Sequence, residues 1–122
     1  MEKINSYQDL KVWQRAMELA ELVYKHTSKF PKEETYGLTS QLRRASVSIA
    51  ANIAEGRGRN TLGEFAQFLG IARGSLAELE TLLILSQRLG YTQDQDHHAM
   101  IAFCTEVSKM IVGLKKSIAA GN

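Results

Sequence analysis

Three histidines, one cysteine and several acidic residues are the side chains of this 122-residue chain that could bind a metal or attack a substrate. A carboxylate-bridged di-iron site in a helical bundle needs two Glu-x-x-His pairs and two further glutamates. The sequence offers one related spacing, Asp94-Gln95-Asp96-His97, and the adjacent His97 and His98 would point about 100° apart on a helix. We therefore expect no metal site, and histidines that are solvated at the surface.

Motifs for nucleophilic catalysis and for dinucleotide binding are also missing. No serine stands in a Gly-x-Ser-x-Gly context. The run Gly56-Arg57-Gly58-Arg59 follows a helical pattern and lacks the third glycine of a dinucleotide-binding loop. Cys104 is accompanied by Phe103 and Val107, which is typical of a small buried residue. We expect no catalytic residue, no cofactor and no enzymatic activity.

A line of polar residues recurs every three or four positions beside an apolar seam: Gln41, Arg44, Ser48, Asn52, Glu55 and Arg59. Asn52 stands in the otherwise apolar run 49–54, which favours a hydrogen-bonded network that fixes helix register. A polar binding site inside a bundle is the alternative. The predicted network consists of Arg44, Ser48, Asn52, Glu55 and Arg73, with Glu55 paired to Arg44 or Arg73.

Charge is unevenly distributed, although 15 basic and 13 acidic residues leave a net charge of only +2. Residues 35–77 hold five arginines against two glutamates, whereas residues 78–108 hold one arginine against five acidic residues. Arginine suits bidentate contact with phosphate or carboxylate. Arg43 and Arg44 are expected to pair internally with Glu55 or Glu78, unlike the arginines that follow. The predicted nucleic-acid contacts are Arg57, Arg59, Lys115 and Lys116; solvated or ion-paired charges are the alternative.

The elements that must position these residues are helices, because apolar residues recur at helical spacing and the chain has a single proline, Pro31. The spacing predicts helices at about residues 7–28, 36–55, 62–89 and 93–119. Capping pairs mark three of their starts: Ser6 with Asp9, Thr61 with Glu64, and Thr92 with Gln95. Long helices joined by short loops predict an all-α, antiparallel up-down-up-down four-helix bundle, with residues 1–122 as one domain.

Composition excludes several classes of protein. With 44% apolar and 23% charged residues the chain is typical of a folded globular protein. One cysteine cannot form an internal disulfide, and no apolar run is long enough to span a membrane. The first residues contain no apolar segment of signal-peptide length. We expect a cytoplasmic protein with no membrane partner.

The predicted helix 7–28 carries two apolar stripes, one more than a four-helix monomer needs. Its first stripe comprises Leu10, Trp13, Met17, Ala20 and Tyr24, and Trp13 is expected to be largely buried in the core. Surplus apolar surface indicates a subunit interface. The residues predicted for that interface are Val12, Ala16, Leu19 and Val23, with Ile101, Cys104 and Ile111 from the last helix.

Several segments, in fixed order, resemble one known family: residues 7–14 (YQDLKVWQ), 30–34 (FPKEE), 36–45 (YGLTSQLRRA), 47–49 (VSI), 52–56 (NIAEG) and 72–81 (ARGSLAELET). The chain is similar, over about residues 6–118, to the four-helix-bundle proteins encoded in intervening sequences of 23S ribosomal RNA genes. That resemblance implies a four-helix bundle that assembles as a ring of five, with no enzymatic activity attached. A more distant likeness is to the accessory variability determinant of retroelements, a five-fold barrel thought to bind nucleic acid and a reverse transcriptase.

Pattern and resemblance together predict a homo-oligomeric scaffold, a homopentamer by resemblance, that binds RNA or DNA through a basic rim. The alternative is a protein–protein adaptor that binds no nucleic acid. Arg57 and Arg59 in the loop carry the first hypothesis, because a ring would repeat their charge in every subunit. Co-purification of nucleic acid that salt removes would distinguish the two.

Overall fold

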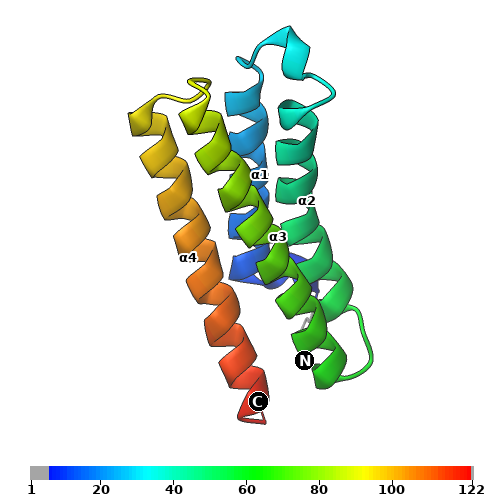
Figure 1. The fold of residues 1–122 in the computed structure, drawn as a ribbon. Coiled ribbons are helices and arrows are strands. Elements are labelled where there is room, and N and C mark those ends of the chain that lie inside the picture. Colours follow the sequence, from blue (N-terminus) through cyan, green and yellow to red (C-terminus); the bar gives the residue numbers. More distant parts are fainter. Residues whose placement is uncertain (1–5, 122) are drawn as a thin grey trace.

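Four long helices run antiparallel to one another, each beside its neighbour in sequence (Figure 1). The computed structural model describes residues 6–121, and in this part of the chain all regular elements are helical. The long helices are α1 (Lys11–Thr27), α2 (Leu38–Arg57), α3 (Leu62–Arg88) and α4 (Asp94–Ala119). Two short 3-10 turns, η1 (Tyr7–Asp9) and η2 (Lys32–Glu34), precede α1 and α2. The predicted all-α up-down-up-down bundle is confirmed.

Local capping explains where some helices begin. At α3 the hydroxyl of Thr61 accepts a hydrogen bond from the backbone N–H of Glu64 at 3.1 Å, as predicted. Ser6 caps the turn η1 and not α1, because Leu10 is extended and interrupts the helix before Lys11. The predicted cap at Thr92 is wrong: α4 begins after Gln93, which makes no side-chain cap.

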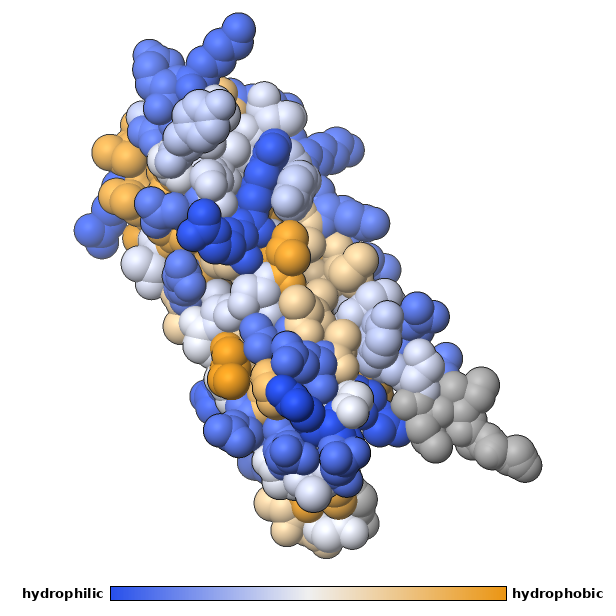
Figure 2. Space-filling model, turned by 90° about the vertical axis from the view of Figure 1, so that its right-hand side faces the viewer, coloured by the Kyte–Doolittle hydropathy of each residue, from blue (hydrophilic) through white to orange (hydrophobic). Residues whose placement is uncertain are grey.

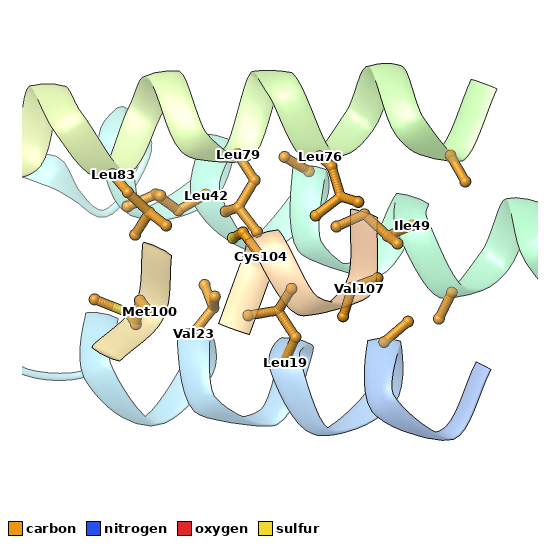
Figure 3. Packing of buried hydrophobic residues seen from close by; sticks show 14 of the residues in the cluster. Leu19, Val23, Leu42, Ile49, Leu76, Leu79, Leu83, Met100, Cys104 and Val107 are labelled. Carbon is orange, nitrogen blue, oxygen red and sulfur yellow. The ribbon is translucent and has the colours of Figure 1, made fainter. Parts of the chain in front are cut away.

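The hydrophobic core lies along the centre of the bundle and receives side chains from all four helices (Figure 3). Leu19 of α1, Leu42 of α2 and Leu79 of α3 are fully buried there. From α4, Met100 and Cys104 reach the same centre. Burial of these apolar side chains supplies the main driving force for assembling the helices.

Glycine lets α2 and α3 approach each other closely near the loop that joins them. A Cβ atom added to Gly56 of α2 would lie only 2.6 Å from the Cβ of Phe68 in α3. This position therefore requires glycine for steric reasons. Gly90, between α3 and α4, has φ +84°, a backbone conformation that glycine adopts without the penalty of a side chain.

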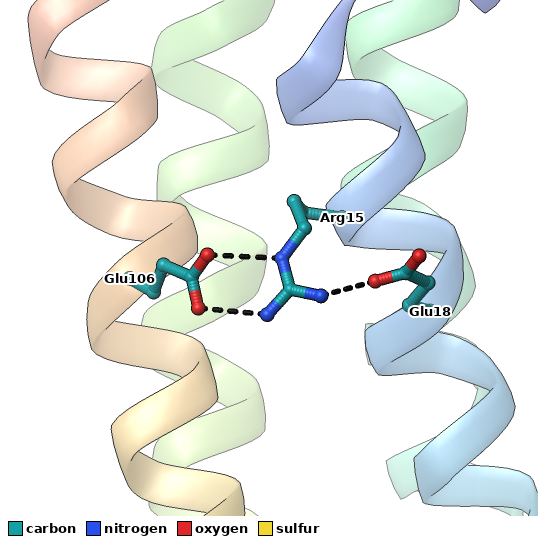
Figure 4. Close-up of polar contacts among 3 residues, drawn as sticks. All are labelled: Arg15, Glu18 and Glu106. Atoms are coloured by element: carbon teal, nitrogen blue, oxygen red, sulfur yellow. Dashed lines mark hydrogen bonds and ion pairs between the residues drawn. The ribbon is translucent and has the colours of Figure 1, made fainter.

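The outer seam between α1 and α4 is held by Arg15, which bridges the two helices (Figure 4). Its Nε and Nη2 atoms donate to the two carboxylate oxygens of Glu106 at 2.9 and 2.8 Å, and Nη1 contacts Glu18 on its own helix. The guanidinium carbon lies 4.2 Å from the centroid of the Phe103 ring, in cation–π contact. Hydrogen bonds from Arg15 lower the pKa of Glu106.

Within residues 6–121, none of the helices combines the length and the apolar character that crossing a lipid bilayer requires.

Candidate functional site

The outer surface between α1 and α2 is a groove of about 530 Å³ with mostly apolar walls. We call it the α1–α2 groove; its lining residues are Tyr7, Trp13, Met17, Ala20, Glu21, Tyr24, Val47, Ala50, Ala51 and Ala54. Three of its large side chains are substantially exposed: Met17 (39%), Tyr24 (44%) and Val47 (45%). Figure 2, viewed from the right-hand side of Figure 1, shows hydrophobic side chains running through the middle of the face between hydrophilic ones.

The groove reverses the predicted roles of the two stripes of α1. Six of the seven predicted interface residues are at most 4% exposed inside a single chain: Val12, Ala16, Leu19, Val23, Cys104 and Ile111. The seventh, Ile101, is partly buried against the same core. The prediction that these residues form a subunit interface is therefore wrong, because the fold of one chain already covers them.

The first stripe of α1 supplies the surplus apolar surface instead. Trp13 was expected in the core, but it is half-buried at the edge of the groove. Its ring meets that of Tyr7 edge-to-face, with 5.2 Å between the centroids. Met17 and Tyr24 continue the stripe along the exposed wall. Helix α1 therefore does carry a surplus apolar stripe, but it is the stripe with Trp13 and not the predicted stripe with Leu19.

The four predicted nucleic-acid contacts converge on one end of the bundle. The C-terminal ends of α2 and α4 lie at that end (Figure 1), and Arg57, Arg59, Lys115 and Lys116 belong to these segments. We call it the basic end. Arg59 is partly engaged there: its Nη2 donates to Glu55 at 3.1 Å, and its guanidinium packs on Phe68.

Arg57 and the two lysines are less engaged. Arg57 is half-buried and Lys116 is exposed. Lys115 lies along α3, where its Nζ would be 3.5 Å from a Cβ atom placed on Gly70. None of the ion pairs among residues 6–121 involves these three side chains.

The predicted polar network forms only in its centre. Asn52 Nδ2 donates to the backbone oxygen and to the hydroxyl of Ser48, at 2.8 and 3.0 Å. The Ser48 hydroxyl lies 2.9 Å from that of Ser75 on α3, so the three polar side chains link two helices. The outer part of the prediction is wrong: Glu55 pairs with Arg59, while Arg44 and Arg73 are exposed.

Two of the three histidines are less solvated than the sequence indicated, whereas His98 is exposed as predicted. His26 Nε2 lies 3.0 Å from the hydroxyl of Thr92, which explains why Thr92 does not cap α4, and burial lowers the pKa of His26. His97 is buried, and its Nδ1 has no hydrogen-bond partner among the described residues. The structure between residues 6 and 121 gathers no group of three or more His, Cys, Asp or Glu side chains that could hold a metal ion.

Cys104 lies in the core, where burial raises the pKa of its thiol to about 12. A thiol with that pKa is protonated at neutral pH, and the thiolate is the form that attacks electrophiles and binds metals. Its environment is therefore that of an inert apolar side chain.

Comparisons with known proteins place these features in a family. The model of the 23S rRNA-intervening sequence protein family matches residues 8–113. A solved structure of a protein of unknown function from the S23 ribosomal protein family of Bacteroides thetaiotaomicron is 25% identical, with a TM-score of 0.77. That match covers 86% of this chain and 98% of the other. A comparison with curated proteins finds no significant match. The chain belongs to the family of 23S rRNA-intervening sequence proteins.

Proposed function

We propose that this protein is a non-enzymatic, cytoplasmic scaffold whose copies assemble through the α1–α2 groove into a ring that binds RNA or DNA. Five subunits is the number that the family resemblance implies. The observation that carries the proposal is the α1–α2 groove, an apolar surface left open by the fold of a single chain. Large exposed apolar patches on folded proteins mark interaction sites.

A second copy of the chain suits the groove for a physical reason. Its walls combine aromatic and methionine side chains from α1 with alanines of α2 that leave room for an incoming side chain. Aromatic residues and methionine are enriched at the centres of protein–protein interfaces. One charged residue, Glu21, lines the groove, so a partner would desolvate little charge.

The basic end supports the nucleic-acid part of the proposal. Arg57, Lys115 and Lys116 come from sequence positions almost sixty residues apart, yet the fold brings them to one end. A ring would repeat this end in each subunit and raise the local positive potential. Binding to phosphates through such a rim is tolerant of sequence and depends steeply on salt.

Light scattering coupled to gel filtration tests the assembly. The parent should have several times the chain mass of 13.6 kDa. Ala51→Glu places a charge in the groove and should reduce the mass to that of one chain, because burying an unpaired carboxylate is costly. Ala102→Glu, the same change at an exposed position of α4, is the matched control and should keep the parent mass. A monomeric parent, or an unchanged mass for Ala51→Glu, contradicts the proposal.

Binding measurements at two salt concentrations test the basic end. Arg57→Glu combined with Lys116→Glu should weaken binding to RNA and DNA and flatten its salt dependence. Arg73→Glu combined with Arg88→Glu alters the net charge equally at exposed positions outside the basic end, and should weaken binding much less. Equal losses for both double variants would show that overall charge, and not this end, is responsible.

A protein–protein adaptor is the second candidate, and a separate patch favours it. Ile84, Leu85 and Leu89 of the α3 C-terminal region are each at least 40% exposed, and a hollow of about 310 Å³ adjoins the first two. An oligomeric parent that binds neither RNA nor DNA near physiological salt would make the adaptor the better hypothesis.

A further inference from the structure

A second hollow, of about 360 Å³, opens near the start of α2, at the opposite end of that helix from the basic end. Two tyrosines, Tyr24 and Tyr36, and two arginines, Arg43 and Arg44, contribute to its walls, together with three hydroxyl side chains. We call it the arginine hollow. It shares Tyr24 with the α1–α2 groove, so it lies next to the surface proposed for assembly.

The two arginines bring positive charge to the hollow, and among residues 6–121 neither forms an ion pair with an acidic side chain. Arg43 is held in place: its Nε donates to the Thr27 hydroxyl at 2.9 Å, Nη2 donates to the Tyr24 backbone oxygen at 3.3 Å, and the guanidinium carbon lies 4.5 Å from the Tyr24 ring centroid. Arg44 is exposed and makes none of the side-chain hydrogen bonds that hold Arg43. The sequence from 35 to 54 contains no Asp or Glu.

Glu34, which directly precedes the lining residue Thr35 in the sequence, contacts other partners. Glu34 accepts the backbone N–H of Leu38 at 3.0 Å and the hydroxyl of Tyr91 at 3.1 Å. Its carboxylate therefore caps the start of α2 and does not line the arginine hollow. The hollow is left with guanidinium and hydroxyl donors, which suit an anion with several acceptor oxygens, such as phosphate.

Tyr36 adds an aromatic surface to these donors. Its side chain is 96% exposed, more than any other large hydrophobic residue of the described chain, and the structure gives it no packing partner in the core. An exposed ring beside arginines is the arrangement with which proteins bind single-stranded nucleic acid: the base stacks on the ring and the backbone contacts the cations. In a duplex the faces of the bases are covered by their neighbours.

We propose that the arginine hollow binds one nucleotide of single-stranded RNA or DNA, with the base against Tyr36 and the phosphate at Arg43 and Arg44. This inference rests on the proposed function and deepens it by adding a contact outside the basic end and a preference for single strands. Each subunit of an assembly would offer one such contact beside the α1–α2 groove.

Fluorescence anisotropy with labelled 12-nucleotide oligo(dT) and oligo(U), and with a duplex of equal length, tests the inference. Tyr36→Ala should weaken single-strand binding by about 5-fold or more, as expected for the loss of one stacked base, and should leave duplex binding unchanged. Tyr36→Phe keeps the ring and should bind like the parent. Arg44→Gln should weaken binding and reduce the salt slope by about one phosphate contact, whereas Arg73→Gln, at an exposed position of α3, should not.

Photocrosslinking provides a readout of position. An oligonucleotide with 5-iodouracil should crosslink to the peptide that contains Tyr36, and Tyr36→Ala should abolish that product. If Tyr36→Ala binds single strands like Tyr36→Phe while Arg57→Glu with Lys116→Glu weakens binding, the inference fails and the proposed function stands. If the parent binds no nucleic acid at all, the proposed function itself fails, and this inference with it.

Discussion

Helix α1 is bordered by α4 on one side and by α2 on the other, and the two borders are closed in different ways. Toward α4, Arg15 joins Glu106 through two hydrogen bonds and covers the ring of Phe103. Toward α2, Trp13 and Met17 border an open apolar groove. A single chain thus closes the α1–α4 border with its own polar groups and leaves the apolar α1–α2 border open.

This difference shows that the two apolar stripes of one helix can have different roles. The stripe with Leu19 and Val23 is completely buried and belongs to the monomer. The stripe with Trp13 and Met17 is only partly covered, and its apolar area would be better satisfied by another molecule. Substitutions in the buried stripe should therefore affect mainly the stability of the fold. Substitutions in the exposed stripe should affect mainly the proposed assembly.

The largest effect on stability is expected in the core, under the buried stripe of α1. Leu19 is 0% exposed, so Leu19→Ala removes buried methyl groups and leaves a cavity that should lower the free energy of unfolding by about 2–5 kcal/mol. Urea denaturation measures this change. Lys25→Ala, on an exposed part of the same helix, should change the free energy by less than about 0.5 kcal/mol. A Leu19 variant as stable as the parent would place this stripe outside the core.

A smaller loss is expected at the open border. Trp13 is half-buried, so Trp13→Ala should lower the free energy of unfolding by about 1–3 kcal/mol, less than for a fully buried tryptophan. Trp13→Ala should also reduce the oligomer mass. Leu19→Ala, measured under conditions in which it is folded, should reduce that mass less. Urea denaturation and light scattering at one protein concentration measure both quantities. If Trp13→Ala lowered the free energy of unfolding as much as Leu19→Ala and left the oligomer mass unchanged, the two stripes would not differ in role.

The smallest effect is expected at the closed border and depends on pH. Since Arg15 lowers the pKa of Glu106 in the folded state below its ordinary value of 4.5, the folded protein binds fewer protons than the unfolded chain there. The stabilisation by Glu106 is therefore present above pH 4.5 and is lost as the pH falls through the lowered pKa. Glu106→Gln should be less stable than the parent at pH 7 and equal to it in acid; added salt should also shrink the difference.

The control for this prediction is Glu78→Gln, which changes an exposed glutamate that forms no ion pair with another residue in the range 6–121. Thermal melts of both variants from pH 7 into acid check it. An unchanged gap between Glu106→Gln and the parent across this range would show that the border is held by packing on Phe103 and not by the ion pair.

Features decided by neighbours in sequence were predictable, and those decided by distant contacts were not. The cap at Thr61 is formed with Glu64, three residues away, and was predicted correctly. Thr92 has an equally good local signal, but its hydroxyl meets His26, which is 66 residues away. Likewise, the two stripes of α1 are both apolar, and the positions of α3 and α4 decide which of them is buried.

The candidate sites also differ in how far the sequence predicts them. Up-down topology alone was enough to bring Arg57 and Lys116 to one end, because consecutive helices alternate in direction. The arginine hollow was missed because Arg43 and Arg44 were expected to pair with glutamates, and Glu55 instead pairs with Arg59 one helical turn away. A signal was nevertheless present in the sequence: Tyr36 stands near the start of a stretch of twenty residues, 35–54, that holds two arginines and no acidic residue.

Cys104 can report how often the bundle opens. It is the single thiol of the chain, it is 0% exposed, and its pKa of about 12 keeps it protonated while the bundle is closed. An alkylating reagent can react only after the helices separate, when the thiol returns to its ordinary pKa near 9. The rate of labelling therefore measures how often the native protein opens. No introduced probe is needed, and labelling rates measured under different conditions compare how often the helices separate.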